Sequence, residues 1–190
     1  MTSIRKWQKL DSKWIIQNEW CTIRQDSVQL ASGKILDDYF INVRPDVALV
    51  LPVTPQQDVV FVRQYRHGVE KILLELPAGK FDPAEEESLA AAQRELEEET
   101  GYISCQWSKL ATVHDSPVQD TNQVHIFLAE NAVLEGTQHL DDNEELEVVL
   151  IPFADTFKQI ESGEICVSGT IVALFLGWQR LSHPLEGSRE

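Results

Sequence analysis

The sequence predicts an α/β (α+β) protein in which a mixed β-sheet is sandwiched between helices, with an antiparallel β-sheet before it. Three observations favour this fold. Short runs rich in Val, Ile, Leu and aromatic residues recur along the chain and are bounded by Gly, Pro and Asp, as strands usually are. Three longer segments have the apolar spacing and stop signals of helices. With 190 residues, 43% of them hydrophobic, the chain can bury one substantial core, and a sheet covered by helices on both faces is the economical layering.

Residues 1–46 are expected to form the N-terminal antiparallel strands. Strands are predicted at Trp14–Gln17, Thr22–Leu30 and Tyr39–Val43, and Ser32 followed by Gly33 is a turn signal. A sheet of about three strands is marginal alone and needs a surface to pack against.

Residues 47–183 are expected to form the core domain, and residues 184–190 a disordered tail. Strands are predicted at Ala48–Pro52, Val59–Tyr65, Ile72–Leu76, Trp107–Val113, Val124–Ala129 and Glu147–Ile151. Helices are predicted at Ser88–Thr100, Ala154–Glu161 and Gly169–Leu181. The last of these is apolar on most sides, so we expect it to be buried.

Composition excludes several classes of protein. A formal charge of −15 repels the phosphate backbone, so nucleic-acid binding through a basic patch is not expected. The three scattered cysteines show neither a disulfide framework nor zinc spacing, which favours a reducing, cytoplasmic location and small core roles for the cysteines. The N-terminus lacks an apolar signal core, and no apolar run is long enough to cross a bilayer.

The predicted helix at 88–100 carries a crowd of acids in its last turn and a half. At about 100° per residue, Glu95, Glu98 and Glu99 lie within about 100° of one another on one face. Like charges so close destabilise a helix, and negative charge near the C-terminus opposes the macrodipole. A hard divalent cation bound by oxygen ligands would explain the crowding, whereas the alternative is a solvated acidic surface.

The neighbours of these acids favour the first interpretation. Arg94 precedes Glu98 by four residues and can pair with a carboxylate. Leu89 and Leu96 are one heptad apart and predict an apolar side that packs on the core, and Gly101 is a C-terminal stop.

The stretch from Gly79 to Tyr102 resembles the Nudix box, the signature of the Nudix hydrolases. Matching residues in register are Glu86, Arg94, Glu95, Leu96, Glu98, Glu99, Gly101 and Tyr102. Six residues separate Gly79 from Glu86 where the family has five, so Glu85 is an alternative first Glu, with a longer spacer after it. The extra residue falls at the entry to the helix, where a loop can absorb it.

Sequences around the box resemble the ADP-ribose pyrophosphatase branch of this family. They are Leu36–Phe40 with Pro45–Val47, Val62–Gly68, Glu75–Lys80 and Asp141–Val148. The branch often has Ser-Pro-Gly before its next strand, whereas this chain has the loop Ser116–Asn122, which bears on substrate choice. The resemblance implies hydrolysis of the pyrophosphate bond of a nucleoside diphosphate sugar, most directly ADP-ribose, to AMP and ribose 5-phosphate. Alternatives are a GDP-sugar, a UDP-sugar or a dinucleotide as substrate, or a sensor that binds ADP-ribose without cleaving it.

The resemblance also implies a cofactor and an assembly. The cofactor is Mg²⁺, with Mn²⁺ as a possible substitute, and in the family the metal sits on the box glutamates and a backbone carbonyl. The corresponding ligands here are Ala78, Glu95, Glu98, Glu99 and Glu144. Pro77 and Gly79 are expected to hold the Ala78 backbone in a tight turn. In the family the N-terminal strands pack on a partner subunit, which implies a homodimer.

The acidic loop Asp141–Glu145 is the candidate source of a general base, because metal-bound carboxylates accept protons poorly. Glu144 is the preferred base or metal ligand and Asp142 is the alternative, while a merely solvated loop is the competing interpretation. Arg94 and Glu98 complete the predicted catalytic set.

Two arginines are candidate ligands for the substrate. The guanidinium groups of Arg63 and Arg66 suit phosphate or ribose oxygens, and Arg66 matches the family better. Trp14, Trp20 and Phe40 could offer an aromatic face to adenine, although a plain packing role competes for each.

Overall fold

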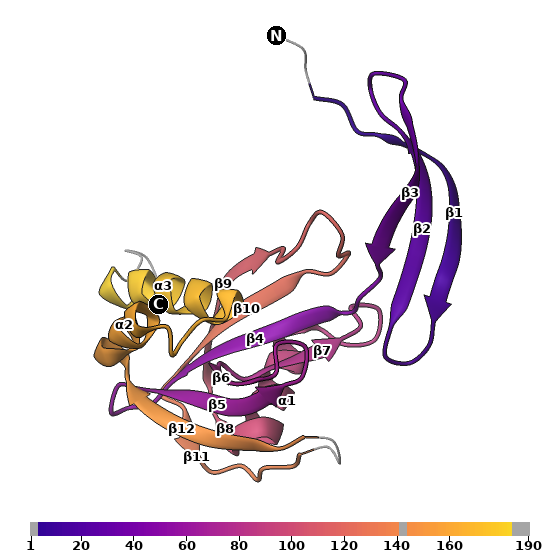
Figure 1. The fold of residues 1–190 in the computed structure, drawn as a ribbon. Coiled ribbons are helices and arrows are strands. Elements are labelled where there is room, and N and C mark those ends of the chain that lie inside the picture. The colour runs from indigo at the N-terminus through magenta and orange to yellow at the C-terminus, as the bar shows by residue number, and fades with distance from the viewer. Residues whose placement is uncertain (1–3, 141–143, 184–190) are drawn as a thin grey trace. The chain divides into compact units, whose positions relative to one another are not determined.

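A computed structural model describes residues 4–140 and 144–183 of the chain. The chain divides into two compact units (Figure 1). The first comprises Met1–Pro45 with His114–Asn122, and the second comprises Asp46–Val113 with Gln123–Glu190. The predicted tail at 184–190 lies outside the described residues.

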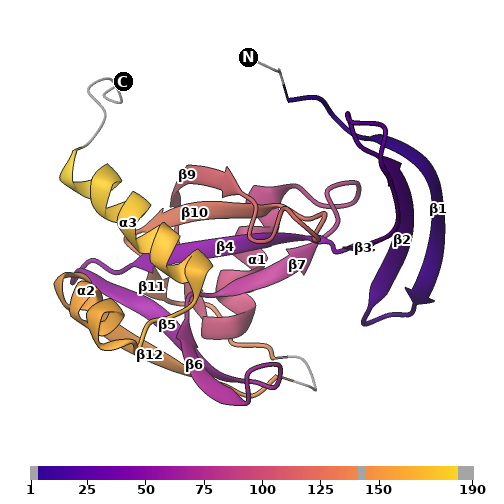
Figure 2. The ribbon, with the colours of Figure 1, turned by 45° about the horizontal axis from the view of Figure 1, so that its top comes forward.

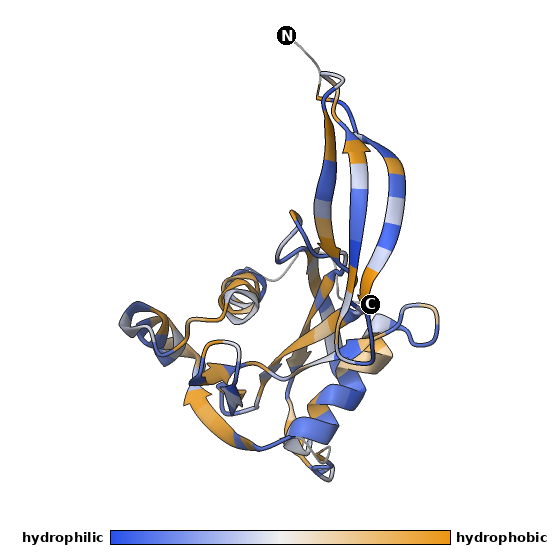
Figure 3. Ribbon diagram, turned by 45° about the vertical axis from the view of Figure 1, so that its right-hand side comes forward, coloured by the Kyte–Doolittle hydropathy of each residue, from blue (hydrophilic) through white to orange (hydrophobic). Residues whose placement is uncertain are grey.

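The first unit is built on a three-stranded antiparallel sheet, as predicted. Its strands, in the order β1-β2-β3, are β1 (Gln8–Gln17), β2 (Thr22–Gln29) and β3 (Ile35–Asn42), and they curve side by side in Figure 2. Both hydrophilic and hydrophobic residues occur along these strands, without a regular alternation (Figure 3). β1 begins at Gln8 rather than at Trp14, and all ten of its residues are exposed.

Side-chain hydrogen bonds attach segment 114–122 to this sheet. Asp120 accepts from Asn42 Nδ2 at 2.8 Å and from Arg44 Nη1 at 3.0 Å. The hydroxyl of Tyr39 donates to the carbonyl of Val118 at 2.7 Å. The loop that departs from the branch pattern is therefore held by residues of the N-terminal unit.

The second unit contains a seven-stranded sheet. Its strands are β4 (Asp46–Val53), β5 (Asp58–Arg66), β6 (Lys71–Glu75), β7 (Ala78–Phe81), β9 (Gln106–Val113), β10 (Val124–Glu130) and β12 (Leu146–Pro152). The main path is β12-β5-β4-β10-β9, while β6 pairs with β5 and β7 pairs with β4. The sheet is mixed, because β10 runs parallel to β4 and the other pairs are antiparallel. The short strands β8 (Tyr102–Ile103) and β11 (Val133–Leu134) form a separate pair.

Helices cover both faces of this sheet, which confirms the predicted layering (Figure 1). One face of β4 carries Ala48 and Val50, and it packs in one cluster with Leu96 of α1 (Ser88–Thr100). The other face carries Leu49 and Leu51 and packs with α3 (Ser168–Ser182). Successive residues of β4 therefore point to opposite faces of the sheet and pack into two different hydrophobic cores.

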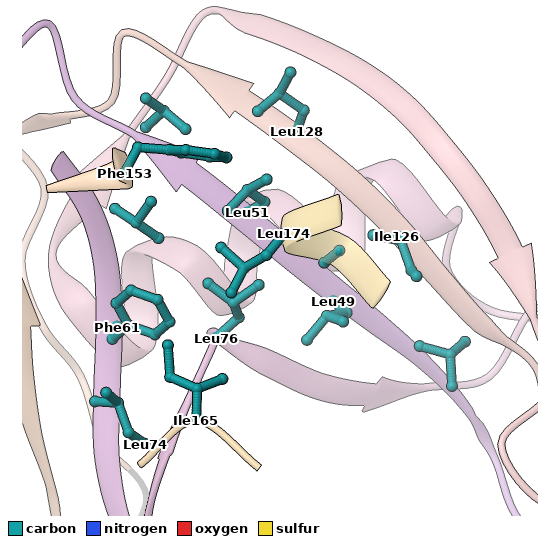
Figure 4. Close-up of a cluster of buried hydrophobic side chains, with 14 residues drawn as sticks. Leu49, Leu51, Phe61, Leu74, Leu76, Ile126, Leu128, Phe153, Ile165 and Leu174 are labelled. Carbon is teal, nitrogen blue, oxygen red and sulfur yellow. The ribbon is translucent and has the colours of Figure 1, made fainter. Parts of the chain in front are cut away.

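The larger core lies on the α3 side, where α2 (Phe153–Ser162) contributes Phe153. Figure 4 shows Phe61, Leu76, Ile126 and Leu174 converging there, and each side chain is at most 2% exposed. This core fixes α3 and the strands that carry the site.

Three expectations about burial were wrong. Leu89 is 39% exposed, because the face of α1 toward the sheet is lined by Ala91, Ala92 and Leu96 instead. Helix α3 is not buried all round, since Phe175 and other apolar residues on its outer side are exposed. The cysteines are all exposed rather than in the core: Cys21, Cys105 and Cys166.

The tight turn expected at Pro77–Gly79 is also absent from the structure. Residues 78–81 form strand β7, in which Ala78 lies opposite Leu49 and Gly79 lies opposite Ala48. A pairing with a strand thirty residues away leaves no local signal, so the Pro and Gly suggested a turn. Within the described residues, no helix is long and apolar enough to cross a membrane.

Candidate catalytic site

The last turn of α1 lies against strand β7, and one buried acid joins them. Glu99 is only 4% exposed, and its Oε2 accepts a hydrogen bond from the backbone N–H of Ala78 at 3.1 Å. The helix ends directly afterwards, because Gly101 takes the left-handed conformation (φ 71°) and its N–H donates to the carbonyl of Glu97. The helix bounds match the sequence prediction.

Gly79 provides the space for a second carboxylate. A Cβ atom at this position would lie 1.9 Å from Cδ and Oε1 of Glu95, so the Glu95 carboxylate packs directly over the β7 backbone. Only glycine permits this approach. The first residue of the box motif therefore has a steric role in the site.

Arg94 links three of the acids in the motif. Its Nε and Nη2 donate to the two carboxylate oxygens of Glu86 at 3.2 and 3.0 Å. Its Nη1 donates to Glu95 at 2.6 Å and to Glu98 at 2.9 Å. The fork-like pairing with Glu86 is the geometry expected of an arginine and a carboxylate.

This pairing identifies Glu86, rather than Glu85, as the acid that Arg94 engages. A turn absorbs the extra residue before it, since the carbonyl of Asp82 accepts from the N–H groups of both Glu85 and Glu86 at 2.9 Å. The Asp82 side chain also accepts from the N–H of Ala84 at 2.9 Å.

Burial and the charges of neighbouring carboxylates raise the pKa values of two glutamates in the site. Burial, followed by the charge of Glu95, raises the pKa of Glu99 to about 8, although the Ala78 N–H and the charge of Arg66 oppose the rise. Burial also raises the pKa of Glu95, against the hydrogen bond from Arg94. The hydrogen bond to Glu86 raises the pKa of Arg94 above its usual range. A positive charge placed among these acids would relieve their repulsion.

Glu144 belongs to the same group of charges. Its charge contributes to the raised pKa of both Glu95 and Glu99. The start of β12 lies beside the end of β5 that carries Arg66, since Leu146 lies opposite Gln64 and Glu144 precedes Leu146 by two residues. Asp142, the alternative base, lies outside the described residues.

The segment before this acidic loop is fastened to the end of α1. The N–H of His139 donates to the carbonyl of Glu98 at 2.9 Å, and Nε2 of Gln138 donates to the carbonyl of Glu99 at 2.7 Å. The N–H of Gly136 donates to the carbonyl of Gly101 at 3.0 Å. These bonds satisfy carbonyls that a helix end leaves without partners.

Arg66 reaches toward the site along the face that β5 turns to α1. Its Nε donates to Glu75 at 2.6 Å, and its positive charge lowers the pKa of Glu99. Glu75 is the last residue of β6, lies opposite Val62 and comes three residues before Ala78. Sequence reasoning missed Glu75, although an acid two residues before Pro-Ala-Gly, on the strand paired with Arg66, was a usable signal.

Arg63 is not brought to the site. It lies three residues from Arg66 on one continuous strand, so the two side chains project from opposite faces. Nη1 of Arg63 donates to Glu147 at 3.0 Å, and Nη2 lies 3.8 Å from Glu164.

The donor set suits a hard cation, but it is not assembled around one. Carboxylate oxygens are the ligands that Mg²⁺ prefers, and a cation here would offset both the burial of Glu99 and its repulsion by Glu95, the two largest causes of its raised pKa. Among the described residues, no group of three or more Asp, Glu, His or Cys side chains is placed so that it could hold a metal ion as it stands. Glu95 and Glu98 are instead engaged by Arg94.

Two family profiles match the chain. One, described as the NUDIX domain, matches residues 43–165. The other, described as the nucleoside diphosphate sugar hydrolase N-terminal domain, matches residues 7–42.

Individual proteins give a consistent result. The chain is 35% identical over 161 residues to the ADP-ribose pyrophosphatase of Bacillus subtilis (strain 168), covering 77% of this chain and 86% of that protein. It is 32% identical over 147 residues to the GDP-mannose pyrophosphatase of Escherichia coli O9:H4 (strain HS), covering 73% and 74%. A crystal structure of an ADP compounds hydrolase superposes with a TM-score of 0.84 at 22% identity, covering 96% of this chain and 98% of that one, and this likeness shows the fold.

Proposed function

The chain belongs to the Nudix hydrolase family, and on that premise we propose that it hydrolyses the pyrophosphate bond of a nucleoside diphosphate sugar. ADP-ribose is the favoured substrate and AMP and ribose 5-phosphate are the products. The relative from Bacillus subtilis, which is named for this activity, aligns over most of its own length with this chain.

One observation carries the proposal. The carboxylates of Glu95 and Glu99 converge on the β7 backbone at Gly79 and Ala78, and the charges of Glu144 and Arg66 act on Glu99 from nearby. Acids that hold a cation beside an arginine that can hold a phosphate are what pyrophosphate hydrolysis requires. A packed structural helix needs neither.

We assign the cofactor as Mg²⁺, with Mn²⁺ as a substitute. The ligands would be the Ala78 carbonyl with the carboxylates of Glu95, Glu98 and Glu99, and Glu144 would join them where Asp142 is the base. When bound, the metal neutralises phosphate oxygens and activates water. Glu95 and Glu98 would have to give up part of their pairing with Arg94, so the cation and Arg94 compete for the same oxygens.

The chain's own groups have the following proposed roles. Glu144 accepts the proton of the attacking water, with Asp142 as the alternative base. Arg94 holds Glu98 and Glu95 in place, and Arg66 binds a phosphate of the substrate. Arg63 is paired with acids on the other face, so the proposal rests on Arg66.

Incubation with ADP-ribose and magnesium, followed by detection of AMP, tests this function. We expect Glu99→Gln to lower kcat by about 100-fold or more, as loss of a group acting in the transition state does. Glu97→Gln is the matched control, because Glu97 is on the exposed side of the same turn. Near-normal turnover by Glu99→Gln at saturating magnesium would refute the metal assignment.

A substrate panel addresses the alternatives. The similarity to a GDP-mannose pyrophosphatase makes a GDP-sugar the second candidate, and the loop Ser116–Asn122 is the feature to exchange if specificity differs. Tight ADP-ribose binding without AMP release would identify a sensor instead.

We further propose a homodimer in the cytoplasm. The N-terminal strands and the connection between β1 and β2 carry exposed aromatic side chains, including Trp14, Trp20 and Phe40, and a second subunit would cover them. The scattered cysteines form no disulfide among the described residues, which is compatible with a reducing compartment.

A further inference from the structure

Glu75 engages only the Nε edge of the Arg66 guanidinium. Glu75 accepts from Nε of Arg66 at 2.6 Å. Within residues 4–140 and 144–183, this is the one ion pair formed by Arg66, and neither Nη atom has a hydrogen-bond partner. The end of the guanidinium that can grip an oxyanion with two parallel N–H groups therefore stays available.

The geometry of the hairpin shows that Glu75 determines the direction of this arginine. Arg66 lies opposite Lys71 at the far end of the β5–β6 pair, whereas Glu75 lies opposite Val62, four residues nearer the site. The Arg66 side chain must therefore run back along the strand to reach Glu75. Lys71 repels it from behind and Glu75 attracts it forward.

Glu75 is itself fixed to the framework that holds the carboxylates. The N–H of Leu76, the next residue, donates to Oγ1 of the buried Thr170 at 3.1 Å. The carbonyl of Pro77 accepts from the N–H of Val50 at 2.9 Å, and the N–H of Ala78 donates to Glu99. The anchor for Arg66 and the anchor for Glu99 are thus three residues apart on one hydrogen-bonded segment.

Exposure supports the same assignment of roles. The Glu75 side chain is only 12% exposed, whereas that of Arg66 is 44% exposed. An ordinary surface ion pair has both partners in solvent and contributes little. In this pair the Glu75 carboxylate is largely buried, whereas the Arg66 guanidinium is accessible to solvent.

We propose that Glu75 is a positioning residue that holds the Arg66 guanidinium by its Nε edge, so that the two terminal nitrogens are presented to a phosphate of the substrate. This rests on the proposed function and extends it to a residue outside the acidic cluster. Fixing the rotamers of Arg66 before binding removes an ordering cost that the substrate would otherwise meet.

Steady-state kinetics with ADP-ribose and magnesium test the proposal in a double-mutant cycle of Glu75→Gln, Arg66→Ala and the double variant. We expect Glu75→Gln to raise KM about 10-fold and change kcat by less than about 3-fold, as loss of uniform substrate binding does. In the Arg66→Ala background, Glu75→Gln should cause no further change. The matched control is Glu147→Gln, which breaks the comparable pair with Arg63 on the other face of β5 and should leave KM unchanged.

Two further measurements separate the possible outcomes. Calorimetry of ADP-ribose binding without metal should show the same weakening in Glu75→Gln, Arg66→Ala and the double variant. If Glu75→Gln lowers the unfolding midpoint, Glu75→Asp serves as a second variant. It keeps the charge and should therefore raise KM less than Glu75→Gln does.

A lower kcat with unchanged KM, or losses that multiply in the double variant, would overturn the proposal, because Glu75 would then act independently of Arg66. Wild-type protein that fails to cleave ADP-ribose would count against the proposed function, and the cycle would then be run on the nucleoside diphosphate sugar that is cleaved. Wild-type protein that binds no such compound would overturn both.

Discussion

The backbone N–H of Ala78 donates a hydrogen bond to Oε2 of Glu99 across 3.1 Å, which joins strand β7 to the last turn of α1. The carboxylate is buried, and burial together with the charge of Glu95 raises its pKa to about 8 from an ordinary 4.5. One hydrogen bond is insufficient to keep Glu99 ionised at neutral pH without a cation.

Metal-free protein should therefore lose stability as the pH rises from about 4.5 to about 8. In this window the folded state binds more protons than the unfolded state, so the free energy of unfolding falls with pH. The loss should be on the order of a few kcal/mol, since each unit of pKa difference is worth about 1.4 kcal/mol. Urea unfolding in EDTA at several pH values measures it, and magnesium at pH 8 should restore the loss. Glu99→Gln should flatten the profile and Glu97→Gln should not, whereas a flat wild-type profile would contradict the expectation.

Gly79→Ala should impair catalysis far more than stability. The new Cβ would lie 1.9 Å from the Glu95 carboxylate, which can swing aside because it is the end of a flexible side chain. Displacing a carboxylate that is proposed to bind the metal can cost about 100-fold in rate. Gly68→Ala is the control, since its Cβ would meet nothing within 4 Å. Turnover and thermal unfolding of both variants should show low activity with a near-normal midpoint for Gly79→Ala alone.

The site illustrates what the sequence could and could not predict. The bounds of α1 were predicted because Leu96, the acids and Gly101 are local signals, although Leu89, the other half of the expected apolar side, is exposed. The turn expected at Pro77–Gly79 was wrong because the pairing of β7 with β4 is remote in sequence. Strand β1 was predicted too short because it has no buried face to give it an apolar alternation.

The two arginines show a signal that was present but overlooked. Arg63 lies in the predicted strand Val59–Tyr65 and Arg66 directly follows it. Extending that strand by one residue, as in β5, puts the two arginines an odd number of residues apart, so they could not both face the carboxylates. Which of them faces the site depends on the register of β5 with β4 and on where α1 packs, and neither is written in the local sequence.

Glu86→Gln should weaken the site, whereas Glu85→Gln should leave it unchanged. Arg94 holds both oxygens of Glu86 and none of Glu85, which is exposed. Because Arg94 and Glu86 are each about one-third exposed, the loss of stability should stay near ~1 kcal/mol. The larger effect should be on turnover, about 10-fold, since Arg94 also orients Glu95 and Glu98. Equal effects of the two substitutions would show that this register of the motif is wrong.

Thr170→Val should destabilise the protein by about 1–3 kcal/mol. The substitution keeps the shape of a side chain that is 1% exposed but removes the acceptor for the Leu76 N–H, and an unpaired buried donor costs that amount. Thr156→Val is a fair comparison because this equally buried hydroxyl donates only to the carbonyl of Phe153 in its own helix. Chemical denaturation of both variants should show the larger loss for Thr170→Val, and the reverse order would indicate that the hydrogen bond between α3 and Leu76 is dispensable.

The N-terminal sheet should mediate assembly. Strand β1 has no buried residue, and Trp14, Ile15 and Ile16 are each at least 40% exposed, an arrangement that a three-stranded sheet cannot sustain alone in water. Light scattering should therefore give about twice the 21.6 kDa of one chain. Trp14→Glu should shift the protein toward the monomer, because a charge in an apolar interface is costly. Val69→Glu introduces the same charge at an exposed apolar position on the β5–β6 turn and should leave the mass unchanged. A monomeric wild type at micromolar concentration, with the N-terminal strands still folded by circular dichroism, would show that the sheet is stable without a partner.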